Sequence, residues 1–178
     1  MFDAYLDIET TGLSSRDSQI TVIGLYLVNS GGARLVQLVG QQVEAGNLLE
    51  ELAGVRALYT YNGSRFDLPF INAVLGINLA GLCAHHDLMY DCWQRHLRGG
   101  FKAVERQLGI GRQLQGITGW DAVVLWRRYC NRGDQNALAM LLQYNKEDVV
   151  NLKALREKLG VHPSGSQPIR HDPRPGEG

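Results

Sequence analysis

The stretch that most constrains the fold lies near the N-terminus, where two carboxylates interrupt an apolar segment. It runs Tyr-Leu-Asp-Ile-Glu-Thr-Thr-Gly-Leu, from Tyr5 to Leu13. The apolar and aromatic residues predict a strand, and in a strand residues i and i+2 point to the same face. Asp7 and Glu9 should therefore project together from one face of a sheet. The Thr-Thr-Gly that follows ends the strand and brings the backbone close to whatever the carboxylates hold.

Two anions side by side are costly unless a cation or a proton compensates their charge. Carboxylate oxygens are the ligands that hard divalent cations such as Mg²⁺ and Mn²⁺ prefer. The pair of Asp7 and Glu9 therefore indicates a metal site at the end of a strand. Taken alone, these two residues leave open the alternative of a solvated acidic turn after an edge strand.

The size and composition of the chain narrow the class of protein. Its 178 residues suffice for one domain with a sizeable core. There is no apolar run long enough to cross a bilayer and no secretory leader pattern, so we expect no membrane partner. Three cysteines without a C-x-x-C pair argue against a disulfide framework and for a reducing compartment. We therefore expect a cytoplasmic protein.

The charges are distributed unevenly, although the formal net charge is zero. Residues 1–94 hold four basic and ten acidic residues, whereas residues 95–132 hold eight basic and two acidic ones. An acidic half beside a basic segment suits an enzyme that holds cations with its acids and phosphates with its bases. The alternative is that the bases are ordinary charged helix surfaces.

The first half of the chain alternates strand and turn patterns. β-branched and apolar residues predict strands over 19–28 and 33–39, joined by an Asn-Ser-Gly-Gly turn. A short helix is expected over 47–52 and a fourth strand over 55–61. A second helix should run from about 66 to 75, with Asp67 as its N-cap. A short fifth strand is expected over 82–88, and it ends near His85, His86 and Asp87, for which an active-site role stays open.

The second half is predicted to be helical. Segments at 89–97, 101–108, 121–130 and 135–159 carry helical patterns, and the last has one apolar stripe that Gly160 ends. Four of the five prolines lie in 161–178, which we interpret as a disordered tail. The predicted organisation is therefore one domain over 1–160 and a tail over 161–178.

Two further acids and a tyrosine stand at informative places. Asp67 follows the fourth predicted strand, within Asn-Gly-Ser-Arg-Phe-Asp. Tyr144 and Asp148 are spaced i, i+4 in the last helix, so they share one helix face. Each has a plain structural alternative: a helix cap for Asp67, a core aromatic for Tyr144 and a surface charge for Asp148.

Together these motifs resemble the DEDD superfamily of 3′–5′ exonucleases, which have the ribonuclease-H-like fold. Asp-x-Glu-Thr-Thr-Gly resembles the first exonuclease motif, Asn-x-x-x-Phe-Asp the second, and Tyr-x-x-x-Asp the third in its tyrosine version. The similarity spans about residues 3–158. The Gly-Gly-Phe-Lys stretch and the final helix resemble a bacterial subgroup of predicted exonucleases.

The resemblance implies an α/β fold: a five-stranded mixed sheet, made of an antiparallel meander plus parallel strands, with helices on both faces. It also implies that two divalent cations, Mg²⁺ or Mn²⁺, are cofactors. Their ligands would be Asp7, Glu9, Asp67 and Asp148, and Tyr144 would position the attacking water.

The implied substrate is the 3′ end of a single-stranded DNA or RNA. Thr10, Gly12 and Leu13 would contact the terminal nucleotide, with Leu13 against the last base, and Asn62 and Phe66 would line the same cleft. Two alternatives remain open from the sequence. One is a catalytically silent binding or scaffold module of the same fold, and the other is a structure-specific endonuclease.

Overall fold

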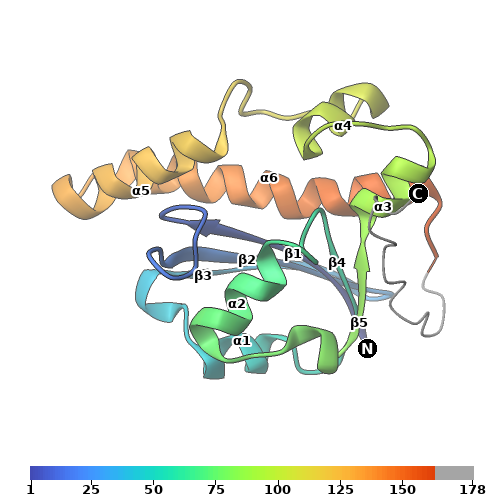
Figure 1. Cartoon of the computed structure of the whole chain (residues 1–178), viewed down its shortest axis with the longest axis horizontal. Helices are drawn as coiled ribbons and strands as arrows, with labels where there is room; N and C mark the ends of the chain where they lie inside the picture. The colour runs from blue at the N-terminus through green and yellow to red at the C-terminus, as the bar shows by residue number, and fades with distance from the viewer. Residues whose placement is uncertain (163–178) are drawn as a thin grey trace, which may run out of the picture.

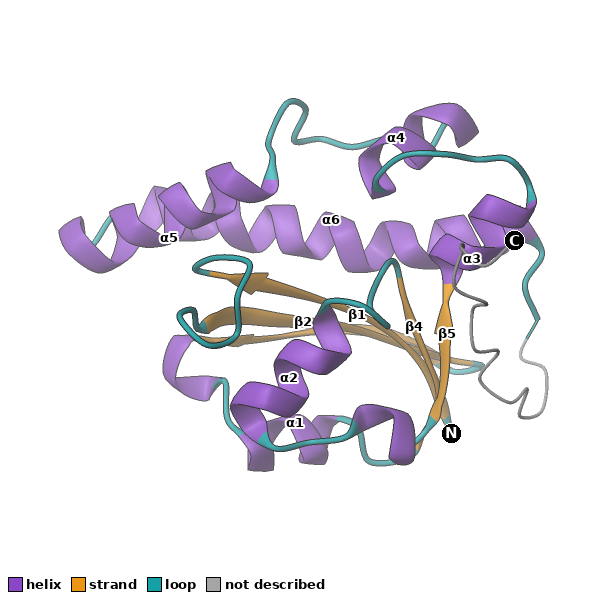
Figure 2. Ribbon diagram, viewed as in Figure 1, coloured by secondary structure: helices purple, strands orange, loops and turns teal. Residues whose placement is uncertain are grey.

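The computed structural model describes residues 1–162, and these form one five-stranded sheet with the strand order β3-β2-β1-β4-β5 (Figure 2). β1 pairs antiparallel with β2, and β2 with β3, whereas β4 runs parallel to β1 and β5 parallel to β4. This is the predicted meander plus parallel strands. The strands are β1 Phe2–Thr10, β2 Ile20–Asn29, β3 Gly32–Val39, β4 Val55–Thr60 and β5 Ala84–Asp87.

Helices cover both faces of the sheet, as predicted (Figure 1). α1 and α2 lie on one side, and the long α6 crosses the other side with α5 beside it. The helices are α1 Ala45–Glu51, α2 Asp67–Leu75, α3 Leu88–Gln94, α4 Phe101–Leu108, α5 Gly119–Arg132 and α6 Gln135–Leu159, and short 3₁₀ turns occupy Gly40–Gln42 and Leu79–Gly81. No helix among residues 1–162 has the length and apolarity to cross a membrane.

The alternation of side chains along β1 separates the core from the site. Ala4, Leu6 and Ile8 are buried in the cluster that α1 and α2 complete. Tyr5 lies in the other cluster, with Leu152 and other residues of α6. Asp7 and Glu9 follow Tyr5 at two-residue intervals, so their side chains point toward α6. One strand thus supplies the hydrophobic core on one face and two carboxylates on the other.

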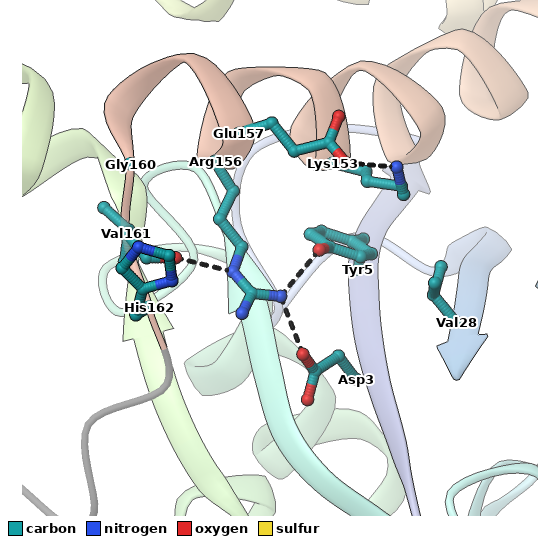
Figure 3. A pocket seen from close by; sticks show the side chains of 9 residues that line it. All are labelled: Asp3, Tyr5, Val28, Lys153, Arg156, Glu157, Gly160, Val161 and His162. Carbon is teal, nitrogen blue, oxygen red and sulfur yellow. Dashed lines mark hydrogen bonds and ion pairs between the residues drawn. The ribbon is translucent and has the colours of Figure 1, made fainter. Parts of the chain in front are cut away.

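The C-terminal part of α6 is fixed to the start of β1 by Arg156 (Figure 3). Its Nη1 donates to Oδ2 of Asp3 at 2.7 Å and to the hydroxyl of Tyr5 at 2.8 Å. Its guanidinium lies 4.1 Å from the centroid of the Tyr59 ring, and its Nε donates to the carbonyl of Val161. Asp3, Tyr5, Arg156 and Val161 line a hollow of about 340 Å³, and their polar groups are hydrogen-bonded to one another. We interpret these contacts as a structural link that holds α6 to the sheet.

Several element ends differ from the predictions. The fifth strand is confined to Ala84–Asp87, because Leu82 caps the end of the 3₁₀ turn before it and α3 begins at Leu88. α5 begins two residues earlier than predicted, because Thr118 caps it with a capping box. Gly160 ends α6 at φ 60°, as predicted. Of the predicted tail, 163–178 lies outside the described residues.

Gly24 in β2 is a position where a side chain of α6 lies close to the backbone of the sheet. It pairs with Asp7 across β1 and β2. A Cβ at this position would lie 2.2 Å from Oδ1 of Asn145 in α6, a distance that real Cβ atoms do not adopt. The missing side chain therefore lets the Asn145 amide lie directly on the sheet.

We predict that Gly24→Ala destabilises the fold by about 1–3 kcal/mol, since the added methyl overpacks the contact with Asn145. Gly46→Ala is the matched control, because Gly46 lies in α1 with no atom near its missing Cβ. That change should be neutral or stabilise by up to about 1 kcal/mol. Urea unfolding of both variants measures the difference, and equal midpoints would contradict the close contact at Gly24.

Candidate active site

Three carboxylates from two distant parts of the chain meet on the α6 side of the sheet. Asp7 and Glu9 at the end of β1 and Asp148 in the middle of α6 each offer one oxygen, and these oxygens all lie within 4.8 Å of one another. Glu9 and Asp148 are buried, and Asp7 is partly exposed. The structure therefore brings together three of the four acids that the sequence singled out.

Asp67 reaches the same strand by a different route. β4 pairs with β1 only as far as Tyr59 opposite Tyr5, which leaves the next part of that β1 edge unpaired. The N–H of Ile8 on this edge donates to Oδ1 of Asp67 at 3.1 Å. Asp67 lies outside the group of three, but its carboxylate contacts the backbone between Asp7 and Glu9.

The prediction that Asp67 caps α2 is wrong. Phe66 occupies the cap position without a side-chain hydrogen bond, and Asp67 is the first helical residue. The carboxylate of Asp67 accepts a hydrogen bond from the Ile8 amide of β1. A long-range strand contact has therefore replaced the local cap that the sequence pattern indicated.

Two amides that the sequence did not single out connect the sheet to α6. Nδ2 of the buried Asn145 lies 3.3 Å from both the carbonyl and Oδ2 of Asp7. Gln37 of β3 donates from Nε2 to Oδ1 of Asn145 at 3.0 Å and to the carbonyl of Leu142. The chain of amides orients the Asp7 carboxylate. These hydrogen bonds join β3, α6 and β1. Because they connect distant parts of the chain, no periodic sequence pattern predicts them.

Tyr144 lies one turn before Asp148 on the same face of α6, as their spacing predicts. Lys102 of α4 donates from Nζ to the Tyr144 hydroxyl and lies 4.1 Å from the centroid of its ring. Burial, followed by the charges of Asp148, Glu9 and Asp7, raises the pKa of Tyr144. The phenol therefore keeps its proton at neutral pH.

The carboxylates are poorly compensated by the protein alone. Burial raises the pKa of both Asp7 and Glu9 well above their usual range, and the Asp148 charge raises them further. Burial also raises the pKa of Asp67 to about 7, against the lowering effect of the Ile8 hydrogen bond. Among residues 1–162, Oε1 of Glu9 is buried without a hydrogen-bond partner. Clustered oxygens with an unpaired acceptor suit a hard divalent cation.

The predicted substrate contacts lie on two loops beside this cluster. Leu13 is 88% exposed, in the loop after β1, and the hydroxyl of Thr10, the last residue of β1, donates to the carbonyl of Gly12 at 2.7 Å. In the other loop, Asn62 adopts φ 62°, and Phe66 is partly buried against the core. Their contacts with nucleic acid stay predictions.

Asp87 organises the loop that leads to Asp67. Its carboxylate accepts hydrogen bonds from the N–H groups of Asn62, Ser64 and Met89 and from the Ser64 hydroxyl, at 2.6–3.1 Å. Its role is therefore to shape this loop and to cap α3.

The two histidines before Asp87 have partners in the neighbouring strand β4. A ring nitrogen of His85 lies 2.9 Å from the Thr60 hydroxyl, and burial lowers the pKa of His85 to about 4. His86 stacks on the ring of Tyr59, with the ring centroids 5.3 Å apart. Both side chains are therefore packed against β4.

The family comparison agrees with this arrangement. The RNase_H_2 family, described as RNase_H superfamily, matches residues 4–160. This chain belongs to the RNase H superfamily. The match covers all of the sheet except the first two residues of β1, and all of α6, so the clustered acids lie within the superfamily domain. No curated protein gives a significant match to the sequence.

Solved structures resemble this RNase H-like domain as well. One is described as "apo form of the nuclease". It is 25% identical, with a TM-score of 0.60 over 88% of this chain and 70% of that chain. Another is the family B DNA polymerase from the archaeon Pyrobaculum calidifontis, 16% identical, with a TM-score of 0.68. That similarity covers 89% of this chain and 24% of the polymerase, and it concerns the fold alone.

The raised pKa values predict how stability depends on pH in the absence of metal. Between about pH 4 and their raised pKa, these carboxyl groups bind more protons in the folded than in the unfolded chain. The free energy of unfolding should therefore fall as the pH rises from about 5 to about 8, by about 1.4 kcal/mol for each unit of raised pKa. Melting temperatures in EDTA across this range measure the effect.

Mn²⁺ added at about pH 8 should reverse this loss, because a bound cation compensates the carboxylates. Asp7→Asn, which removes one of the clustered charges, should raise the metal-free melting temperature at this pH and weaken the response to Mn²⁺. A metal-free melting temperature that does not fall over this pH range would contradict the strained acidic cluster.

Proposed function

We propose that this chain is a metal-dependent 3′–5′ exonuclease of the tyrosine-type DEDD group, acting on single-stranded DNA or RNA. The observation that carries the proposal is the convergence of Asp7, Glu9 and Asp148, with Asp67 bonded to the same strand. Membership of the RNase H superfamily and the likeness to a nuclease structure support a nuclease. The motifs favour the bacterial subgroup of predicted exonucleases.

The four acids would hold two divalent cations, Mg²⁺ or Mn²⁺. Bound there, the cations would lower the pKa of a water molecule and stabilise the oxygen that leaves the phosphorus. Asn145 would keep the Asp7 carboxylate oriented, since its amide contacts both the carbonyl and Oδ2 of that residue. The protein would thus hold its ligands in place before any cation arrives.

Tyr144 would position the attacking water rather than remove a proton from it. Its raised pKa keeps the phenol neutral, and Lys102 already donates to the phenolic oxygen. The phenol's own proton is therefore free to be donated to a water or to a phosphate oxygen. Burial raises the pKa of Asp7, Glu9 and Asp148, and the positive charge of Lys102 opposes this rise.

The substrate end would lie over the loops after β1 and before α2. Leu13 is exposed there and available to pack against a terminal base, next to Thr10 and Gly12. Asn62 and Phe66 would line the opposite side, on the loop that Asp87 holds. A scaffold function is disfavoured, because clustered buried carboxylates cost stability that a structural role does not need.

We predict that the protein with Mn²⁺ releases mononucleotides from the 3′ end of a labelled single strand, and that Asp7→Asn reduces the rate to background. Asp17→Asn is the matched control, because Asp17 is an exposed acid in the loop that follows Asp7 and Glu9. Gel analysis of the products on DNA and on RNA measures the activity and the sugar preference.

A 3′-phosphate on the same strand separates the two kinds of nuclease. An exonuclease of this type should be blocked, whereas cleavage that ignores the 3′-phosphate indicates endonuclease action. If wild type and Asp7→Asn are equally inert on both nucleic acids, a non-catalytic module becomes the better explanation.

Tyr144→Phe should lower the turnover rate by about a hundredfold while the Mn²⁺ affinity changes little, because only the hydroxyl that positions water is lost. Tyr26→Phe provides the control, since Tyr26 is a partly buried tyrosine of β2 that faces Tyr5. Single-turnover rates and calorimetric Mn²⁺ titrations separate the two effects. A large loss of Mn²⁺ affinity in Tyr144→Phe would argue against a positioning role.

A further inference from the structure

Arg112 is a buried cation that the sequence placed among the bases for phosphate. It lies in the segment between α4 and α5, and its side chain is only 8% exposed. Its Nε donates to Oε2 of Glu105 at 2.5 Å, and its Nη2 donates to Oδ1 of Asp148. Arg112 therefore joins a carboxylate of α4 to a carboxylate of the acidic cluster, and it is not part of a phosphate-binding surface.

Glu105 is a rigid anchor for this guanidinium. Glu105 is 1% exposed, and both of its carboxylate oxygens accept hydrogen bonds. Oε2 accepts from Arg112, and Oε1 accepts from Nδ2 of Asn151 at 2.8 Å. A carboxylate held on both oxygens has little freedom, so the orientation of Arg112 is defined from the α4 side.

The backbone on both sides of Arg112 is fixed to α6. Asn151 donates from Nδ2 to the carbonyl of Gly111 at 3.1 Å. The N–H groups of Gln113 and Leu114 donate to Glu147 at 3.2–3.3 Å. Glu147 and Asn151 flank Asp148 in α6, so the helix that presents Asp148 also places the arginine that contacts it.

The guanidinium is enclosed by aromatic rings as well. Its Cζ lies 5.6 Å from the centroid of the Phe101 ring and 5.9 Å from that of Tyr144. Within the described part of the chain, its Nη1 is buried and has no hydrogen-bond partner. One nitrogen of the buried guanidinium is thus left without a hydrogen-bond partner, while its other two nitrogens donate to carboxylates. Burying an unpaired N–H group costs stability. This cost indicates that the guanidinium is needed at this position for another reason.

We propose that Arg112 is the positioning residue for Asp148: it holds one carboxylate oxygen and leaves the second available to a divalent cation shared with Asp7 and Glu9. The inference rests on the proposed metal site and adds a residue that acts through a ligand rather than on substrate. A guanidinium suits this task because its planar fork bridges two carboxylates, which the point charge of a lysine does not do.

Two simpler roles predict different outcomes. If Arg112 served only as a counter-charge, its removal would strengthen the binding of a divalent cation, because the cluster would become more negative. If it served only to hold α4 to α6, its removal would lower the melting temperature without changing the affinity for metal. A positioning role predicts weaker metal binding even when the positive charge is kept.

The test is a calorimetric Mn²⁺ titration of the full chain and of three variants: Arg112→Gln, Arg112→Lys and Glu105→Gln. We expect the Mn²⁺ affinity to fall about 10- to 100-fold in Arg112→Gln, as for other partners that orient a metal ligand. Arg112→Lys should also bind Mn²⁺ more weakly than wild type, and Glu105→Gln should show a smaller loss. Arg106→Gln, on an exposed arginine of α4, should bind Mn²⁺ as wild type does.

The outcomes separate the two proposals. Wild-type affinity in Arg112→Lys, or unchanged or tighter binding in Arg112→Gln, overturns the role of Arg112 and leaves the metal site intact. If the wild-type chain binds no Mn²⁺, the proposed function fails and this inference fails with it. Circular dichroism checks folding, and if Arg112→Gln does not fold, Arg112→Lys and Glu105→Gln decide the question.

Discussion

The repulsion among clustered carboxylates is the constraint on which the rest of this structure depends. Three acidic oxygens within 4.8 Å of one another, on buried or partly buried side chains, cannot all be ionised without compensation. The chain supplies part of it through Lys102 and Arg112, one over the Tyr144 ring and one behind Asp148. Burial and the negative charge of Asp148 nevertheless raise the pKa of Asp7 and Glu9, so the compensation is incomplete.

Both the sheet and α6 determine where the clustered carboxylates lie. The even residues of β1 fill the core against α1 and α2, so the register of the strand cannot slip without exposing it. That register points Asp7 and Glu9 at α6, and Gly24 lets the Asn145 amide reach the strand. Arg156 fixes the other end of the helix to Asp3 and Tyr5. The distances within the cluster are thus set by packing across the whole sheet.

Much of this arrangement could be predicted, because it follows from local patterns. The two-residue spacing of Asp7 and Glu9 and the i, i+4 spacing of Tyr144 and Asp148 determine shared faces wherever a strand and a helix form. The order of strands and turns indicated the mixed sheet in the same way. The predicted contacts of Leu13 and Asn62 with nucleic acid are of another kind, since they require a partner that the chain does not contain.

The unpredicted residues are those whose partners come from distant elements. Gln37, Asn145 and Glu105 are polar residues in a strand and two helices, where sequence patterns assign them to solvent. Arg112 was grouped with surface bases, because nothing near it in the sequence reports the buried Glu105 and Asp148 that it joins. Asp67 looked like a cap for the same reason: the unpaired Ile8 amide that it meets is 59 residues away.

The early separation of β4 from β1 has a practical consequence. Beyond Tyr5 the β1 edge that faces β4 is no longer paired with a strand, and the side chain of Asp67 accepts the Ile8 N–H there instead. In the proposed function, Asp67 would therefore be both a metal ligand and a hydrogen-bond partner of the sheet. An inactive variant made by substituting Asp67 would leave the N–H of Ile8 without a hydrogen-bond partner and would disturb β1 itself. Within residues 1–162, the Asp7 side chain accepts no backbone N–H of β1. A substitution of Asp7 is therefore the better choice for trapping a complex with uncleaved nucleic acid.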